Sequence, residues 1–234
     1  ILILNNCTAY HFGSYPKDAY IKKENLNLRD YLSGAISWRK INNPPQLSTA
    51  AMELSRESIK NIPFIIDSHV HLAGMQEKKT DSYIHPSLSE PFFHPIRYIK
   101  TQVFISSLGV WDKEQADFLI VKRLSQLIEN FPQIKYYACL FAFSATYEKK
   151  SQKKDLSRTG IYVSNRYMLE TSKKYNFFIR TGSLHPYQKD LEEKFKQLSE
   201  KQVKLIKVLP NSMNFSPQDS ACKNFFYLLS KYNM

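Results

Sequence analysis

From residue 64 onward, short apolar runs alternate with longer segments that are apolar along one side only. Five runs have the length and content of buried strands, and they lie at 64–72, 101–106, 135–143, 177–184 and 203–209. Four segments have the residue spacing of amphipathic helices, and they lie at 113–130, 164–175, 188–200 and 217–232. Strands that alternate with helices form parallel sheets, so the sequence predicts an α/β fold of about five β-α units.

The segment that follows the first apolar run contains no glycine-rich phosphate loop, which argues against a doubly wound nucleotide-binding fold. We therefore expect a (β/α)8 barrel of the TIM type over residues 62–234. Five units do not close an eight-stranded barrel, so the expectation is a partial barrel. Residues 1–61 are mixed and polar, apart from a helical segment at 48–60, and we interpret them as an N-terminal extension.

Two histidines stand two residues apart at the end of the first apolar run. Side chains alternate across a strand, so His69 and His71 are predicted to point to the same face. Asp67 shares that face one step deeper, where it serves the site or the structure. In a barrel, the carboxyl end of a strand is the active-site end. Two imidazoles at this spacing can hold one divalent cation, and we predict a metal site there.

The motif Ile66-Asp67-Ser68-His69-Val70-His71-Leu72 resembles the first strand of the amidohydrolase superfamily. Further segments resemble a bacterial branch of amidohydrolase-related proteins, and they are residues 94–97, 102–103, 158–159, 162–165, 183–187 and 204–214. The resemblance covers roughly residues 62–234. It implies a distorted (β/α)8 barrel whose metal centre holds one or two divalent ions, in most cases zinc.

The resemblance also implies roles for single residues. His69 and His71 would be the first pair of metal ligands, and Lys207 would be the lysine that becomes carboxylated and bridges two metals. Related proteins add histidines from middle strands and an aspartate from the last strand, which acts as the general base. These have no counterpart here, so we expect that aspartate beyond Met234.

Lys207 and His185 are also candidates on their own sequence positions. Lys207 lies near the end of the run at 203–209 and faces the same way as Val203 and Leu205, so it is predicted to point inward. Carboxylation or a salt bridge to an acidic substrate would offset the cost of burying it. His185 follows a predicted strand and could bind substrate, ligate metal or cap a loop. His85 and His94, each before a proline, are interpreted as structural.

The function expected from these features is hydrolysis of an amide, lactone or ester bond in a small molecule by metal-activated water. A related metal-dependent decarboxylase and an envelope-anchored barrel that only binds are the alternatives. The net charge of +12 raises the question of a metal-dependent nuclease. The lysines are scattered apart from one run at 148–154, however, so we expect no nucleic-acid partner.

The first seven residues resemble the end of an apolar signal segment that leads into a cysteine. In a bacterial lipoprotein, Cys7 would carry a membrane lipid anchor, and the protein would lie in the cell envelope. An ordinary buried strand in a cytoplasmic protein is the other interpretation, because Asn5 and Asn6 replace the usual small residues. The three cysteines are far apart and suggest neither a disulfide framework nor a zinc cluster.

Overall fold

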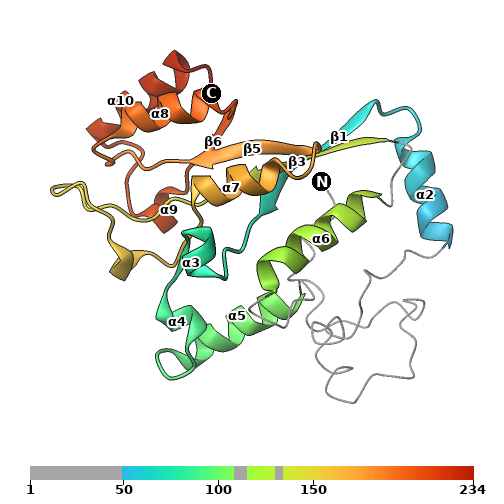
Figure 1. Cartoon of the computed structure of the whole chain (residues 1–234), viewed down its shortest axis with the longest axis horizontal. Coiled ribbons are helices and arrows are strands. Elements are labelled where there is room, and N and C mark those ends of the chain that lie inside the picture. The colour runs from blue at the N-terminus through green and yellow to red at the C-terminus, as the bar shows by residue number, and fades with distance from the viewer. Residues whose placement is uncertain (1–48, 108–114, 130–133) are drawn as a thin grey trace. The chain divides into compact units, whose positions relative to one another are not determined.

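A computed structural model describes residues 49–107, 115–129 and 134–234 (Figure 1). The residues with Cys7 and most of the predicted N-terminal extension lie outside the described part. The extension's helical segment is α2 (Thr49–Ile59), as predicted. Among the described residues, no helix is long and apolar enough to cross a membrane.

A curled four-stranded parallel sheet forms the centre of the fold. Its strands are β1 (Phe64–His71), β3 (Lys135–Phe141), β5 (Phe178–Ser183) and β6 (Leu205–Lys207), in the order β1-β3-β5-β6. The pairing of β3 with β5 and of β5 with β6 is parallel. The predicted α/β architecture with a parallel sheet is therefore confirmed, and the described sheet has the form of a half barrel.

Helices follow the strands as the alternation predicts. They are α6 (Ala116–Glu129), α7 (Asn165–Ser172), α8 (Leu191–Glu200) and α10 (Ser220–Lys231). Ser164 caps α7, because its side chain accepts a hydrogen bond from the backbone N–H of Tyr167. Phe195 of α8 packs edge-to-face on Phe225 of α10 with ring centroids 5.3 Å apart, and both rings are completely buried. The apolar sides of these helices supply much of the core.

Helix α7 is tied to the end of β5 by one side chain. The Asn165 amide accepts a hydrogen bond from the Ser183 backbone N–H and donates one to the Ser183 carbonyl oxygen, both at 2.9 Å. Gly182 precedes Ser183 in β5, and a Cβ added there would meet Leu198 at 3.0 Å and Ile206 at 3.1 Å. The absence of a side chain at Gly182 therefore allows α8 and β6 to pack closely against β5.

The strand predicted at 101–106 is wrong, because these residues lie within α5 (Pro95–Ser107). Pro95 occupies the first position of the helix, where the missing N–H is not needed. The hydroxyl of Thr101 donates back to the carbonyl oxygen of Arg97 at 2.9 Å. A short apolar run does not by itself discriminate a strand from a buried helix. The described sheet consequently has four strands where about five units were expected.

The segment between β1 and α5 contains three short elements, α3 (Glu77–Thr80), β2 (Tyr83–Ile84) and α4 (Pro86–Ser89). Strand β2 pairs antiparallel with β4 (Ile161–Tyr162). The short elements η5 (Leu156–Arg158) and α9 (Pro210–Met213) complete the described fold.

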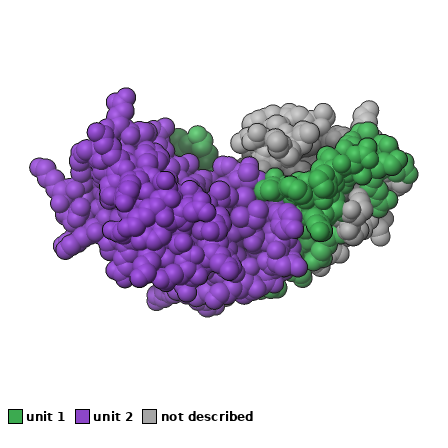
Figure 2. All heavy atoms as spheres, turned by 90° about the horizontal axis from the view of Figure 1, so that it is seen from above, with its two compact units in different colours: residues 1–67, 90–136 green, residues 68–89, 137–234 purple. Residues whose placement is uncertain are grey.

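The chain divides into two compact units, which Figure 2 colours separately. One comprises residues 1–67 and 90–136, and the other comprises residues 68–89 and 137–234. His69, His71, His185 and Lys207 all belong to the second unit.

Candidate metal centre

His69 and His71 lie side by side at the carboxyl end of β1, as the strand alternation predicts. Their ring centroids are 4.6 Å apart, and the ring planes are inclined by 44°. Both side chains are partly exposed. Val70 between them is buried, with 4% of its surface exposed, and points to the opposite face of the strand. The alternation therefore leaves both imidazoles on one accessible face.

Phe141, the last residue of β3, and Phe143, two residues further along the chain, both contact the histidine rings. His69 meets Phe141 edge-to-face at 5.2 Å, and His71 stacks on Phe143 at 4.9 Å with the planes inclined by 16°. Such ring pairs fix the orientation of an imidazole more firmly than contact with aliphatic groups. His71, two residues after His69, contacts Phe143, two residues after Phe141, so the carboxyl ends of β1 and β3 lie together.

Lys207, the last residue of β6, reaches the same place from the other edge of the sheet. Its Nζ lies 3.1 Å from Nε2 of His69 and 4.0 Å from the ring centroid of Phe141. In a flat sheet, edge strands separated by three intervals would lie about 14 Å apart. The contact between Lys207 and His69 is therefore possible because the sheet curls.

The backbone at Lys207 is also held in place. The Ser183 hydroxyl donates a 2.8 Å hydrogen bond to the Lys207 carbonyl oxygen and accepts a 2.9 Å bond from the Ser144 backbone N–H. This single buried hydroxyl connects the ends of three neighbouring chain segments. It fixes the position from which the lysine side chain extends.

Burial changes the protonation of the cluster. Burial beside the aromatic rings, followed by the charge of Lys207 and then by His69, lowers the pKa of His71 to about 4. His71 is therefore a neutral imidazole at neutral pH, with a ring nitrogen lone pair available. Burial also lowers the pKa of Lys207 to about 8.

The donor set fits part of a zinc site. Two neutral imidazoles supply nitrogen ligands that zinc accepts, and zinc sites in enzymes use three protein ligands. Among the described residues, no three His, Cys, Asp or Glu side chains gather closely enough to hold a metal. Lys207 would fit as a third ligand after carboxylation, because its ammonium form repels a cation and its carbamate form binds one. The part of the chain that the structure describes therefore offers two histidines and one convertible lysine.

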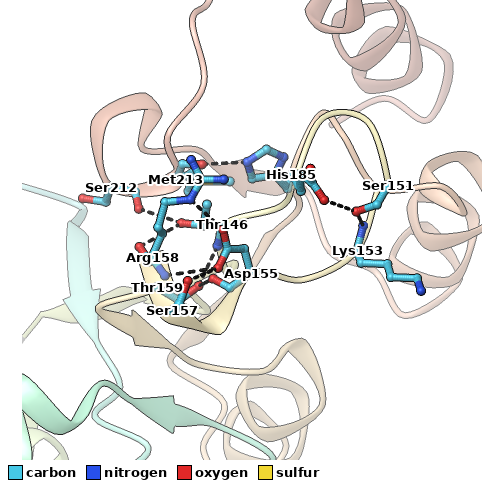
Figure 3. Close-up of polar contacts among 11 residues, drawn as sticks. Thr146, Ser151, Lys153, Asp155, Ser157, Arg158, Thr159, His185, Ser212 and Met213 are labelled. Atoms are coloured by element: carbon cyan, nitrogen blue, oxygen red, sulfur yellow. Dashed lines mark hydrogen bonds and ion pairs between the residues drawn. The ribbon is translucent and has the colours of Figure 1, made fainter.

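His185, a substrate-binding candidate by its sequence position, lies in the interior of the second unit. Its Nε2 lies 2.8 Å from the Met213 carbonyl oxygen (Figure 3). The residue is completely buried, and its Nδ1 accepts a 3.0 Å bond from the Tyr187 backbone N–H. Nε2 must therefore carry the proton and donate. Burial lowers the pKa of His185, and the bond to Met213 opposes this shift. Both ring nitrogens are engaged with loop backbone, which favours the loop-capping role for His185. Its role in substrate binding stays a prediction.

The structure also gives the surroundings of other residues that the sequence analysis singled out or missed. Phe141 and Phe143 were not predicted as site residues, although their spacing of two repeats that of the histidines. Asp67 accepts a 3.4 Å hydrogen bond from the Tyr136 hydroxyl, and with burial this charge raises the pKa of Tyr136. His85 accepts a 3.1 Å bond from the backbone N–H of Ser87, which supports its interpretation as a structural residue.

Comparison with known proteins adds no family assignment. No family model matches the sequence, and neither curated proteins nor solved structures gave a significant match. The geometry of the histidine–lysine cluster and the sequence motif are therefore the features from which a function can be proposed.

Proposed function

We propose that this chain carries part of the metal centre of a hydrolase of the amidohydrolase type, built on a TIM-type barrel, which cleaves an amide, lactone or ester bond in a small molecule. One observation carries the proposal: two histidines from β1 and a lysine from β6 converge at the carboxyl ends of parallel strands, 3.1 Å apart at the closest atoms. Active sites of barrel enzymes are built at this end of the strands.

In this proposal His69 and His71 would hold a divalent ion, with zinc favoured by imidazole ligands. When bound, such an ion lowers the pKa of a coordinated water and polarises the bond to be cleaved. His71 contributes a lone pair because it stays neutral at neutral pH. The ring contacts with Phe141 and Phe143 would hold the imidazoles in place.

Lys207 has two roles open to it in this function. Carboxylated on Nζ, it would complete a ligand set with the histidines. As an ammonium ion, it would orient an acidic substrate beside the metal. The lowered pKa of Lys207 supports the first role, because only the neutral amine reacts with carbon dioxide.

A second candidate is a barrel of the same kind that binds a ligand without turning it over. It is supported by the cationic form of Lys207 beside His69, which opposes metal binding, and by the absence of a third His, Cys, Asp or Glu among the described side chains around the pair. Decarboxylation at the same centre is a further variant of the enzymatic proposal.

The test is a substrate screen, with zinc, manganese or cobalt supplied, on a protein that contains this chain and the general-base aspartate that the resemblance implies. Esters, lactones, amides and small carboxylic acids would be compared for the wild type, the His69→Ala/His71→Ala variant and the exposed-histidine control His94→Ala. Metal-dependent hydrolysis in the wild type and the control, with loss in the double variant, is the expected result. Release of carbon dioxide would identify a decarboxylase, and saturable ligand binding without turnover would identify the binding barrel.

Lys207→Arg separates the two roles of the lysine. Arginine keeps the positive charge but cannot be carboxylated. If the lysine is a ligand, Lys207→Arg loses metal affinity and activity, and the wild type gains activity with added bicarbonate. Retention of activity in Lys207→Arg would show that the lysine acts as a cation.

A further inference from the structure

A hollow lies at the amino ends of the strands, at the opposite end from the histidine pair. It has a volume of about 410 Å³ and lies between the end of α7, the start of β5 and the turn before β6. All of its lining residues belong to the second compact unit. Its volume is within the range of pockets that hold small ligands.

Three cationic side chains line this hollow, and no acidic side chain does. Lys173 comes from the end of α7, Arg180 from β5 and Lys204 from the turn before β6. None of the ion pairs formed within the described residues includes any of the three. Like charges around one hollow repel one another, so this arrangement is stabilised by an anion placed between them.

The side chain of Arg180 is held in place by the protein before any ligand binds. One terminal nitrogen of Arg180 donates a 2.7 Å hydrogen bond to the Lys201 carbonyl oxygen, which anchors the guanidinium group. A guanidinium has five N–H donors, so others are left for a ligand. A planar fork that is held in place binds phosphate oxygens in pairs and loses little side-chain freedom on binding.

Neutral polar and aromatic groups complete the lining. Tyr175, Asn176 and Gln202 border the same hollow. Amide groups can donate to phosphate or hydroxyl oxygens. A phenol ring offers a face for an apolar part of the ligand. The mixture suits a small molecule with one strongly anionic end.

We propose that this hollow binds the phosphate or diphosphate group of a small molecule, through Lys173, Arg180 and Lys204. The site is separate from the histidine pair and does not depend on the proposed hydrolase function. The volume of the hollow, about 410 Å³, matches a small phosphorylated ligand better than the long backbone of a nucleic acid. The ligand contacts three separate chain segments, so its binding would also stabilise this end of the sheet.

Calorimetric titration of the full chain with pyrophosphate tests the proposal. The Lys173→Ala/Lys204→Ala variant is compared with Lys174→Ala/Lys196→Ala, which removes the same charge from exposed lysines outside the hollow. We expect saturable binding of one pyrophosphate per chain to the wild type. Losing charge-assisted bonds should raise the Kd at least about tenfold in the first variant, and the control should change it by less than about twofold.

Arg180→Lys gives a second, independent readout. It keeps the charge and loses the planar fork, so we expect weaker binding of pyrophosphate and little change in the binding of a single-stranded oligonucleotide. Equal weakening in the two lysine variants would overturn the proposal, because it would show general attraction to a basic protein. Absence of saturable binding at millimolar pyrophosphate would overturn it as well, as would tighter binding of the oligonucleotide through the same three residues.

Discussion

Replacing His185 by phenylalanine tests the structural role assigned to that histidine. Phenylalanine keeps an aromatic ring among Tyr147, Tyr187 and Phe215, whose ring centroids lie 4.9 to 5.3 Å from that of His185. It removes both ring nitrogens, so the Tyr187 N–H and the Met213 carbonyl oxygen lose their partners. Each buried group left unpaired costs about 1–3 kcal/mol, which gives a total of roughly 2–6 kcal/mol.

Urea unfolding followed by circular dichroism measures this loss, with His94→Phe as the matched control. His94 is exposed, so its replacement should change the free energy of unfolding by less than about 0.5 kcal/mol. If His185→Phe is as stable as the control, the hydrogen bonds of His185 do not hold the loops. A wild-type His185 that changes its environment on addition of a substrate would also refute the structural assignment.

Three further predictions concern the same unit of the fold. Because the pKa of His185 is lowered in the folded state, the unfolded chain binds more protons than the folded chain below about pH 6.5. The free energy of unfolding should therefore fall on acidification through that region, and it should fall less steeply in His185→Phe. Urea unfolding at several pH values measures this difference. Phe195→Ala should cost about 3–5 kcal/mol in the same assay, whereas Phe226→Ala, with 53% of the side chain exposed, should cost far less; equal losses would contradict the assigned core. Gly182→Ala should cost about 1–3 kcal/mol through crowding by Leu198 and Ile206, while Gly160→Ala, whose nearest neighbour would be 3.9 Å away, should be close to neutral.

The sequence predicts the parts of the fold that follow a regular period. The strands at 135–143, 177–184 and 203–209 and the helices after them are present, with shorter bounds, because alternation of apolar runs and amphipathic segments is a strong signal. The strand at 101–106 was wrong because its apolar run is too short to separate a strand from part of a longer helix. Its replacement by α5 depends on Pro95 and on the residues before the run, which the pattern did not include.

The candidate site was predictable from β1 and less so from its surroundings. Two histidines on one strand must share a face, so their proximity follows from the sequence. The approach of Lys207 depends on the curl of a sheet in which β6 and β1 are opposite edges, and no local pattern gives that curl. His185 has the sequence position of a site residue, but its burial follows from contacts with Met213 and Phe215, about thirty residues away, which spacing cannot predict.

Metal binding by the histidine pair tests the central claim most directly. Equilibrium dialysis of the chain against zinc, followed by elemental analysis, would be compared for the wild type, His69→Ala/His71→Ala and the control His94→Ala. We predict that the wild type and the control retain the same amount of zinc and that the double variant loses it. Zinc content that is unchanged by the double substitution, or absent from all three proteins, would contradict the claim that His69 and His71 are metal ligands.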